Sequence, residues 1–146
     1  RDAMGADFTA KDFRTWGGTL AAMIVLAQMP LPQDEAGAPA GEAALVSVEK
    51  AAVVQVAALL GNTAAVCRKA YIHPQVFAAW RDGGLARELP HSGSLHQLEI
   101  RALALLKRRT RAAMKRGDDT RNYMILSADL LAKMGFEVAE MFESLG

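Results

Sequence analysis

Apolar side chains recur along this sequence at intervals of three and four residues, and prolines and glycines separate the periodic segments. This spacing puts apolar side chains on one face of an α-helix, whereas a half-buried strand would require strict alternation. We therefore predict an all-α chain with no strand and no internal repeat. Helices are expected over residues 10–27, 42–60, 63–71, 75–82 and 94–116 and in a last region after residue 119, with loops over 30–42 and a connector over 83–94.

Residue types that begin or end helices support these boundaries. Thr9 followed by Asp12 resembles a capping box, which opens a helix. Gly61 stands where a glycine commonly ends a helix in the left-handed conformation. Asn62 and Thr63 are both residue types that cap a helix N-terminus, so either can begin the short helix that follows.

The overall composition bounds the class of protein. The 146 residues suit one domain or two small lobes, and a net charge of +1 does not indicate a partner. One cysteine cannot form an internal disulfide, which favours a reducing, cytoplasmic compartment. The apolar stretch from Leu20 to Met29 has about ten residues, whereas about 20 are needed to span a bilayer, so no membrane span is expected. The chain begins at "RDAMGADF" without an initiator Met or a signal peptide, as a fragment would.

Two groups of cations carry possible chemistry. Lys11 and Arg14 are three residues apart, so a helix presents both on one face. Cations at a helix N-terminus oppose the helix dipole, and such a local conflict is a hint of function. Arg68 and Lys69 precede Tyr71 directly. Taken separately, Lys11 and Arg14 are also explained as solvated charge at a helix start, and Tyr71 is also explained as a packed aromatic residue with a solvated hydroxyl.

The order of two sequence blocks is more specific. The block "FTAKDFRTWGGT" (Phe8 to Thr19) precedes "LLGNTAAVCRKAYIHPQV" (Leu60 to Val76), with a variable loop between them. In this order they resemble the catalytic domain of type IB DNA topoisomerases, in particular its bacterial and poxvirus-like branch. The resemblance implies the helical portion of the topoisomerase IB and tyrosine recombinase catalytic domain. We accordingly expect residues 1–90 to be the C-terminal part of that domain and residues 91–146 to be a C-terminal helical extension.

The resemblance also implies a role for each matching residue. Tyr71 matches the nucleophile, Arg14 matches an arginine that binds the scissile phosphate, and Lys11 matches a supporting phosphate contact. Asn62 stands where many members have histidine, and its amide can donate a hydrogen bond to a phosphate oxygen. The implied reaction on double-stranded DNA runs through a 3′-phosphotyrosyl intermediate and relaxes supercoils without ATP, metal or other cofactor. The three histidines are isolated in sequence, and no metal site is predicted.

The family also needs two residues that lie upstream of its K-x-x-R motif. They are an earlier arginine and a lysine on a β-hairpin, which is the general acid toward the leaving 5′-oxygen. This chain has ten residues before Lys11, and Arg1 is too close to be the missing arginine. We therefore expect a C-terminal part of a nucleoid-associated enzyme, inactive alone, whose partners are DNA and the missing N-terminal part.

A basic segment follows the resembling half. Six cations lie between residues 107 and 116, with no acidic residue from 100 to 117. One interpretation is a helix that contacts DNA phosphates, and the other is a solvated face with a core of Leu103, Leu106 and Met114. The DNA-binding candidates in the chain are Arg68, Lys69, Lys107, Arg108, Arg109 and Arg111.

Structural roles are expected for three residues near the motifs. His73 precedes Pro74, which forces the backbone out of a helix, so a role in a local turn is favoured. Cys67 is expected to be a small buried residue, and Trp16 is expected to pack in the core.

Two other functions are compatible with the sequence. A tyrosine recombinase or integrase has a similar catalytic domain and residue order, but recombinases usually carry histidine at the positions of Lys11 and Asn62. A non-catalytic helical DNA-binding module would need neither of the missing upstream residues.

Overall fold

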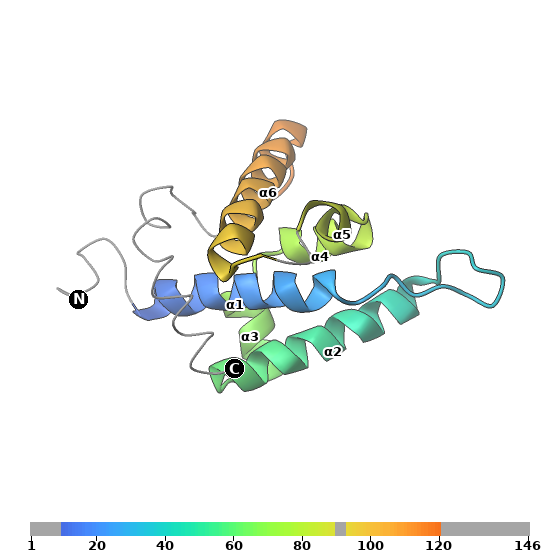
Figure 1. The fold of residues 1–146 in the computed structure, drawn as a ribbon, viewed down its shortest axis with the longest axis horizontal. Helices are drawn as coiled ribbons and strands as arrows, with labels where there is room; N and C mark the ends of the chain where they lie inside the picture. Colours follow the sequence, from blue (N-terminus) through green and yellow to red (C-terminus); the bar gives the residue numbers. More distant parts are fainter. Residues whose placement is uncertain (1–9, 90–92, 121–146) are drawn as a thin grey trace.

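The described part of the chain is helical throughout its regular structure. The computed structural model describes residues 10–89 and 93–120, with residues 10–14 described by their backbone only. Within these ranges no strand forms, and the prediction of an all-α fold is confirmed (Figure 1). The helices are α1 (Ala10–Ala27), α2 (Glu42–Leu60), α3 (Ala64–Tyr71), α4 (Gln75–Arg81), α5 (Gly84–Glu88) and α6 (Leu95–Arg116).

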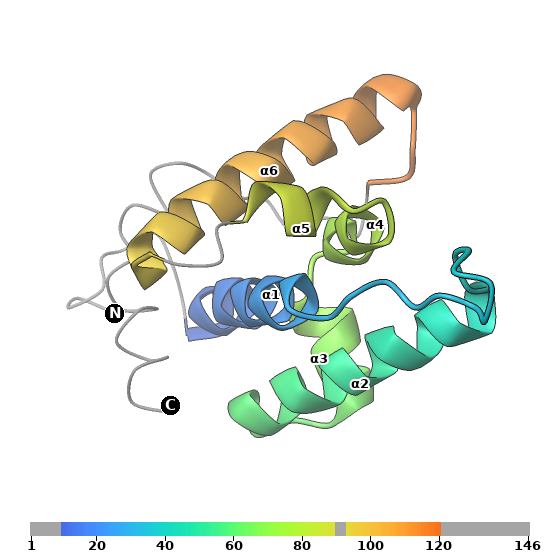
Figure 2. The ribbon, with the colours of Figure 1, turned by 45° about the vertical axis from the view of Figure 1, so that its right-hand side comes forward.

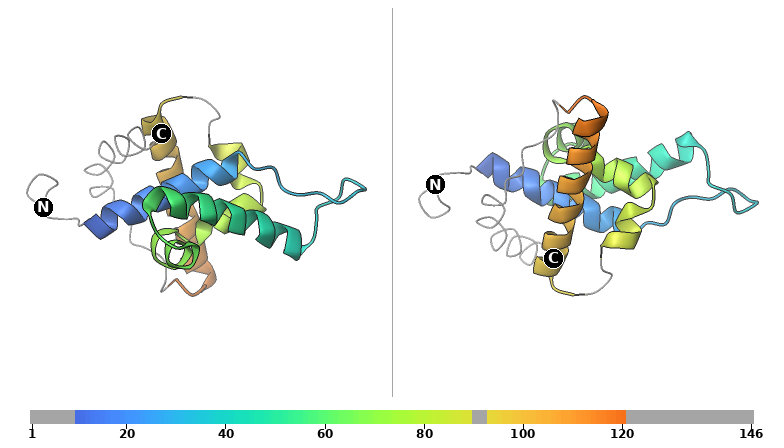
Figure 3. Two further views of the ribbon diagram at one scale, coloured as in Figure 1. Left: turned by 90° about the horizontal axis from the view of Figure 1, so that it is seen from below. Right: turned by 90° about the horizontal axis from the view of Figure 1, so that it is seen from above.

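Helix α1 is the centre of the molecule. It contacts α2 and α3 on one side and α4, α5 and α6 on the other, as Figure 2 shows. In the two views of Figure 3, α2 crosses one face of α1 and α6 crosses the opposite face. Helix α1 is covered on both sides, because Trp16, Leu20 and Met23 are buried on one face and Ala21 and Ala22 are buried on the other. A helix that is apolar around most of its circumference is stable only when it is enclosed in this way.

The end of α2 and the starts of α3 and α6 follow the residues that the sequence indicated. Gly61 ends α2 with φ of 69°, in the left-handed region. Thr63 caps α3 and accepts a hydrogen bond from the Val66 N–H at 3.2 Å. Ser94 and Gln97 form a reciprocal capping box at the start of α6. The predicted Thr9 capping box and the last predicted helix lie outside the described side chains and residues.

One helix was missing from the prediction. Helix α5 lies inside the segment that we predicted to be a connector, so that prediction is wrong over Gly84–Glu88. Gly83 allows the turn, with φ of 81°, and the Asp82 carboxylate accepts the Gly84 N–H at 2.9 Å. A helix of five residues is too short to show an apolar period in sequence.

Residues expected inside the molecule test the predicted core. Trp16 and Cys67 are buried as predicted. Of the residues expected in the core of α6, Leu106 is buried, but Met114 is not a core residue, because its side chain is 62% exposed.

A buried carboxylate ties α2 to α4. Glu49 is 1% exposed, and its two oxygens accept hydrogen bonds from Arg81 at 2.8 and 3.0 Å. Arg81 also donates to Glu42 at 2.7 and 2.9 Å. These hydrogen bonds to two carboxylates raise the pKa of Arg81 above its usual value. The buried charge is therefore paired, as a buried charge must be.

Helix α2 is long and apolar enough, by length and composition, to cross a membrane. Core helices meet the same criterion. In this fold α2 contributes Ala52, Val56 and Leu60 to the core and carries the ion-paired Glu49 near its middle. These contacts account for the apolar residues on one face of α2, whereas Val54 and Leu59 are exposed.

Helix α6 shares the core with the other helices. Ala102, Leu105 and Leu106 belong to the same cluster of buried residues as Trp16. The predicted domain boundary at residue 90 falls in residues 90–92, outside the described part, and it stays a prediction.

Candidate active site at the junction of α1, α2 and α3

The two sequence blocks meet at Gly18. A Cβ atom added to Gly18 would lie 2.8 Å from the Tyr71 backbone oxygen, 3.0 Å from the Tyr71 Cβ and 3.1 Å from the Leu60 Cδ1. Real Cβ contacts are longer than this, so only glycine allows α1 to approach so closely. Helix α1 therefore touches the end of α2 and the end of α3 at one point.

Residues of the K-x-x-R motif share the face of α1 that includes Gly18. Lys11, Arg14 and Gly18 are spaced by three and four residues along one continuous helix. Such residues lie on the same side of a helix, and Arg14 precedes Gly18 by about one turn, or about 6 Å along the axis. The backbone thus brings this motif close to Tyr71, which lies 57 positions after Arg14 in the sequence.

Tyr71 is the last residue of α3. Its side chain is partly buried and packs against the hydrophobic core. Its backbone oxygen accepts a hydrogen bond from the Thr19 hydroxyl at 3.0 Å. The segment that bears the phenol is therefore held on α1 by both packing and a hydrogen bond.

Asn62 belongs to the end of α2 and does not cap α3. Its N–H donates to the Ala57 oxygen at 3.0 Å, in the pattern that closes a helix ending in glycine. Its side-chain amide makes one long hydrogen bond, 3.5 Å, to the Leu60 oxygen. Since Thr63 caps α3, the Asn62 amide retains donor capacity for a ligand. The Leu60 side chain, two residues before Asn62, is one of the groups that surround Gly18.

Beyond Tyr71, the chain is anchored by His73. The His73 N–H donates to the Thr19 hydroxyl at 3.1 Å, and the Gln75 N–H donates to His73 Nδ1 at 3.0 Å. The proton of the neutral ring therefore lies on Nε2, which is 3.4 Å from the Thr110 hydroxyl of α6. Burial lowers the pKa of His73 to about 4, so the ring is neutral near pH 7. The predicted role in a local turn is confirmed.

Thr19 was missed in the sequence. It lies three residues after Trp16 and four before Met23, within the apolar stripe of α1, and it is completely buried. A hydroxyl inside an apolar stripe must be hydrogen-bonded, and this is the signal that could have identified it.

Comparison with known proteins decides the family. The sequence model described as the catalytic core of eukaryotic DNA topoisomerase I matches residues 1–84, which include both sequence blocks. The chain belongs to the DNA topoisomerase I family. No curated protein and no solved structure is significantly similar to the chain. Membership supports a type IB topoisomerase over a recombinase, and it implies DNA as the substrate.

In this topoisomerase chain, Arg68 and Lys69 lie in the last turn of α3. The Arg68 guanidinium is 4.2 Å from the centre of the Phe77 ring and 3.8 Å from the Glu49 carboxylate. A DNA contact by Arg68 stays a prediction, and there DNA would compete with Glu49. Lys69 is exposed.

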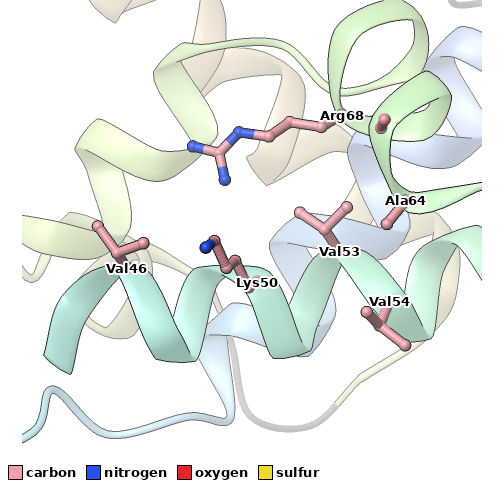
Figure 4. A pocket seen from close by; sticks show the side chains of 7 residues that line it. Val46, Lys50, Val53, Val54, Ala64 and Arg68 are labelled. Carbon is pink, nitrogen blue, oxygen red and sulfur yellow. The ribbon is translucent and has the colours of Figure 1, made fainter. Parts of the chain in front are cut away.

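Arg68 also borders a hollow between α2 and α3. The hollow has a volume of about 500 Å³, and Figure 4 shows the Arg68 side chain extending from α3 above Lys50 of α2. The residues around it are Val46, Lys50, Val53, Val54, Ala64, Ala65 and Arg68.

The six cations of α6 between residues 107 and 116 divide into three that are paired with acidic residues and three that are not, and Arg116 is one of the first three, paired with Asp118 at 2.9 Å. Arg108 is paired with Glu88, and Arg109 holds both oxygens of Asp82 at 2.7 and 2.8 Å, which lowers the pKa of Asp82. Lys107, Arg111 and Lys115, which we call the basic stripe, are spaced by four residues on one side of α6. Among the described residues no ion pair joins the basic stripe to an acidic group.

A metal site has no support in the described part of the chain. No group of three or more His, Cys, Asp or Glu side chains there could hold a metal ion.

Proposed function

We propose that this chain carries the nucleophile and part of the phosphate pocket of a type IB DNA topoisomerase that relaxes supercoiled DNA. The observation that carries the proposal is the close contact of α1 and α3 at Gly18, which brings the K-x-x-R helix against the segment bearing Tyr71. Tyr71 is the nucleophile, Arg14 and Lys11 bind the scissile phosphate, and the Asn62 amide donates to a non-bridging oxygen.

The reaction needs donors around a phosphate. The Tyr71 phenol gives up its proton and its oxygen forms a bond to phosphorus, while the bond from phosphorus to the 5′-oxygen breaks and the 5′-oxygen takes up a proton. Negative charge grows on the non-bridging oxygens during this step. A guanidinium offers two parallel donors to them, and donors positioned in advance lower the barrier by about 3 kcal/mol each.

The intermediate explains why no energy source is required. The phosphodiester bond is replaced by a phosphotyrosyl ester at the 3′ end of the broken strand, and the free 5′ strand can rotate. The 5′-hydroxyl then attacks the ester, restores the strand and returns the proton to the phenol. The ester retains the bond energy, so neither ATP nor a metal ion enters the proposal.

Completion of the pocket requires residues beyond this chain. We infer that an upstream arginine and an upstream lysine, the general acid of the family, complete it in the full-length enzyme. The 146-residue chain alone should then fail to relax a supercoiled plasmid. Relaxation by the purified chain would contradict this part of the proposal.

We assign the enzyme to the bacterial and poxvirus-like branch and to the bacterial cytoplasm, in association with the nucleoid. Support for the branch comes from Asn62, since many other members carry histidine at that position. Support for the compartment comes from the cysteine count, because a single cysteine cannot form an internal disulfide.

The decisive experiment compares the two tyrosines of the chain in the full-length enzyme. Tyr71→Phe should abolish the covalent protein–DNA adduct and leave the dissociation constant for DNA within about twofold, because one hydroxyl contributes little to a contact dominated by phosphates. Tyr123→Phe is the matched control and should still form the adduct. An adduct in the Tyr71→Phe enzyme would refute the assignment, and absence of any adduct in the wild type would favour a non-catalytic DNA-binding module.

A further inference from the structure

The Thr19 hydroxyl forms hydrogen bonds with the backbone of Tyr71, the proposed nucleophile, and with the backbone of His73, two residues later. It donates to the Tyr71 oxygen at 3.0 Å and accepts from the His73 N–H at 3.1 Å. Thr19 itself is completely buried. A hydroxyl has one hydrogen to donate, and here that hydrogen goes to the backbone of the tyrosine.

The end of α3 needs such a partner. Tyr71 is its last helical residue, and the next residue, Ile72, is extended with φ of −118° and ψ of 121°. The last carbonyl groups of a helix have no partner within the helix. Pro74 also prevents the helix from continuing. The position of the Tyr71 backbone is therefore set by groups outside α3.

Gly18 sets the distance between α1 and the end of α3, and Thr19 sets the position of the Tyr71 backbone along α1. The backbone of α1 at Gly18 is in contact with the Tyr71 oxygen and Cβ, with no room for another atom. The neighbouring hydroxyl then joins the two segments by hydrogen bonds on either side of Ile72. Together they hold the tyrosine at a defined place on the helix that carries the K-x-x-R motif.

We propose that Thr19 is a positioning residue for the nucleophile, acting through its hydrogen bonds to the backbone on both sides of Ile72. This inference rests on the proposed function, because it matters for catalysis only if Tyr71 attacks DNA. The Thr19 side chain is completely buried, so it is not accessible to DNA. Its loss should therefore slow attack without weakening the binding of DNA.

The test measures covalent adduct formation in a single turnover by the full-length enzyme on a nicked DNA substrate that cannot be resealed. Thr19→Val keeps the shape of the side chain and removes the hydroxyl, and its rate constant at saturating DNA should fall about 10- to 100-fold, as expected for a nucleophile displaced by a fraction of an ångström to an ångström. Thr19→Ser keeps both hydrogen bonds and should remain within about threefold of wild type.

The measurement separates position from folding. Partial unfolding of Thr19→Val would lower the final amount of adduct, whereas a misplaced tyrosine lowers the rate constant of the molecules that react. A wild-type rate constant in Thr19→Val, or a rate constant in Thr19→Ser as low as that of Thr19→Val, would overturn the proposal.

A second variant keeps the proposal testable if Thr19→Val does not fold. Gly18→Ala leaves the hydroxyl in place but forces the Tyr71 backbone away from α1, and it should show the same lower rate constant. Gly41→Ala is the matched control, since Gly41 has open space around its Cβ position. An unchanged rate constant in Gly18→Ala would count against the proposal.

The same measurements distinguish a wrong role for Tyr71 from a wrong role for Thr19. If the wild type forms no adduct, the role of Tyr71 is wrong and Thr19 has no catalytic consequence. If the wild type forms an adduct that Tyr71→Phe abolishes and Thr19→Val reacts at the wild-type rate, only the role of Thr19 is wrong.

Discussion

Protonation of His73 is expected to destabilise the folded protein in mild acid. The ring is completely buried, and its Nδ1 accepts the Gln75 N–H at the start of α4. Burial holds the pKa of His73 at about 4 in the folded state, compared with 6.5 for an exposed histidine. The unfolded chain therefore takes up a proton at a pH at which the folded protein does not.

The size of this effect follows from the two pKa values. Between pH 6.5 and about 4 the unfolded chain binds more protons, so the free energy of unfolding decreases as the pH falls through this window. At about 1.4 kcal/mol per pH unit, the total loss is about 3 kcal/mol. The contribution is fully present above pH 6.5 and is lost by about pH 4.

The assay is urea unfolding followed by circular dichroism at a series of pH values from 4 to 8. His73→Asn retains an acceptor for the Gln75 N–H but cannot titrate, so the difference from wild type should shrink by about 3 kcal/mol from pH 7 to pH 4. His96→Asn, at an exposed position of α6, is the matched control.

Apart from residue 73, wild type and His73→Asn have the same titrating groups. Arg109 lowers the pKa of Asp82, and burial raises the pKa of Glu99, which opposes the effect of His73. Both contributions cancel in the difference between wild type and His73→Asn. The same pH dependence in His73→Asn and wild type would refute the assignment of the acid effect to this histidine.

The other two predictions concern the ion pairs and the basic stripe. Arg81→Met should reduce the free energy of unfolding by about 3 kcal/mol, measured by urea unfolding, because it leaves the buried Glu49 carboxylate without its closest partner. Arg108→Met, which breaks a largely exposed pair, is the control and should cost less than about 1 kcal/mol; equal losses would contradict the argument. Neutralising the three residues of the basic stripe should reduce the slope of log affinity for DNA against log salt by up to about 2.7 if each contacts one phosphate. Arg109→Met should change this slope less, since Asp82 holds its guanidinium, and an unchanged slope in the stripe variant would exclude a DNA contact there.

Local sequence signals accounted for most of the helices. Apolar spacing located α1, α2 and α6, and the stop at Gly61 and the cap at Thr63 were identified correctly. These features depend on residues within one or two turns of each other, so the amino-acid sequence is enough to predict them. Helix α5 was missed because it is too short to have a period.

Motif order accounted for the family, and the match over residues 1–84 agrees with it. The individual roles of Tyr71, Arg14, Asn62 and Lys11 stay predictions. Their spacing in the sequence did not indicate that α1 and α3 touch at Gly18, because that contact joins residues 53 positions apart.

The tertiary structure decided which of the charged residues have partners. In the sequence, the six cations between residues 107 and 116 form a single group. Folding brings α4 and α5 against one side of α6, so Arg108 and Arg109 are paired with acidic residues and the basic stripe is not. Likewise, Thr19 is an ordinary helix residue until α3 packs against it. Periodicity and caps depend on neighbours in the chain, whereas the partner of a hydroxyl or a charge depends on which distant segments are packed together.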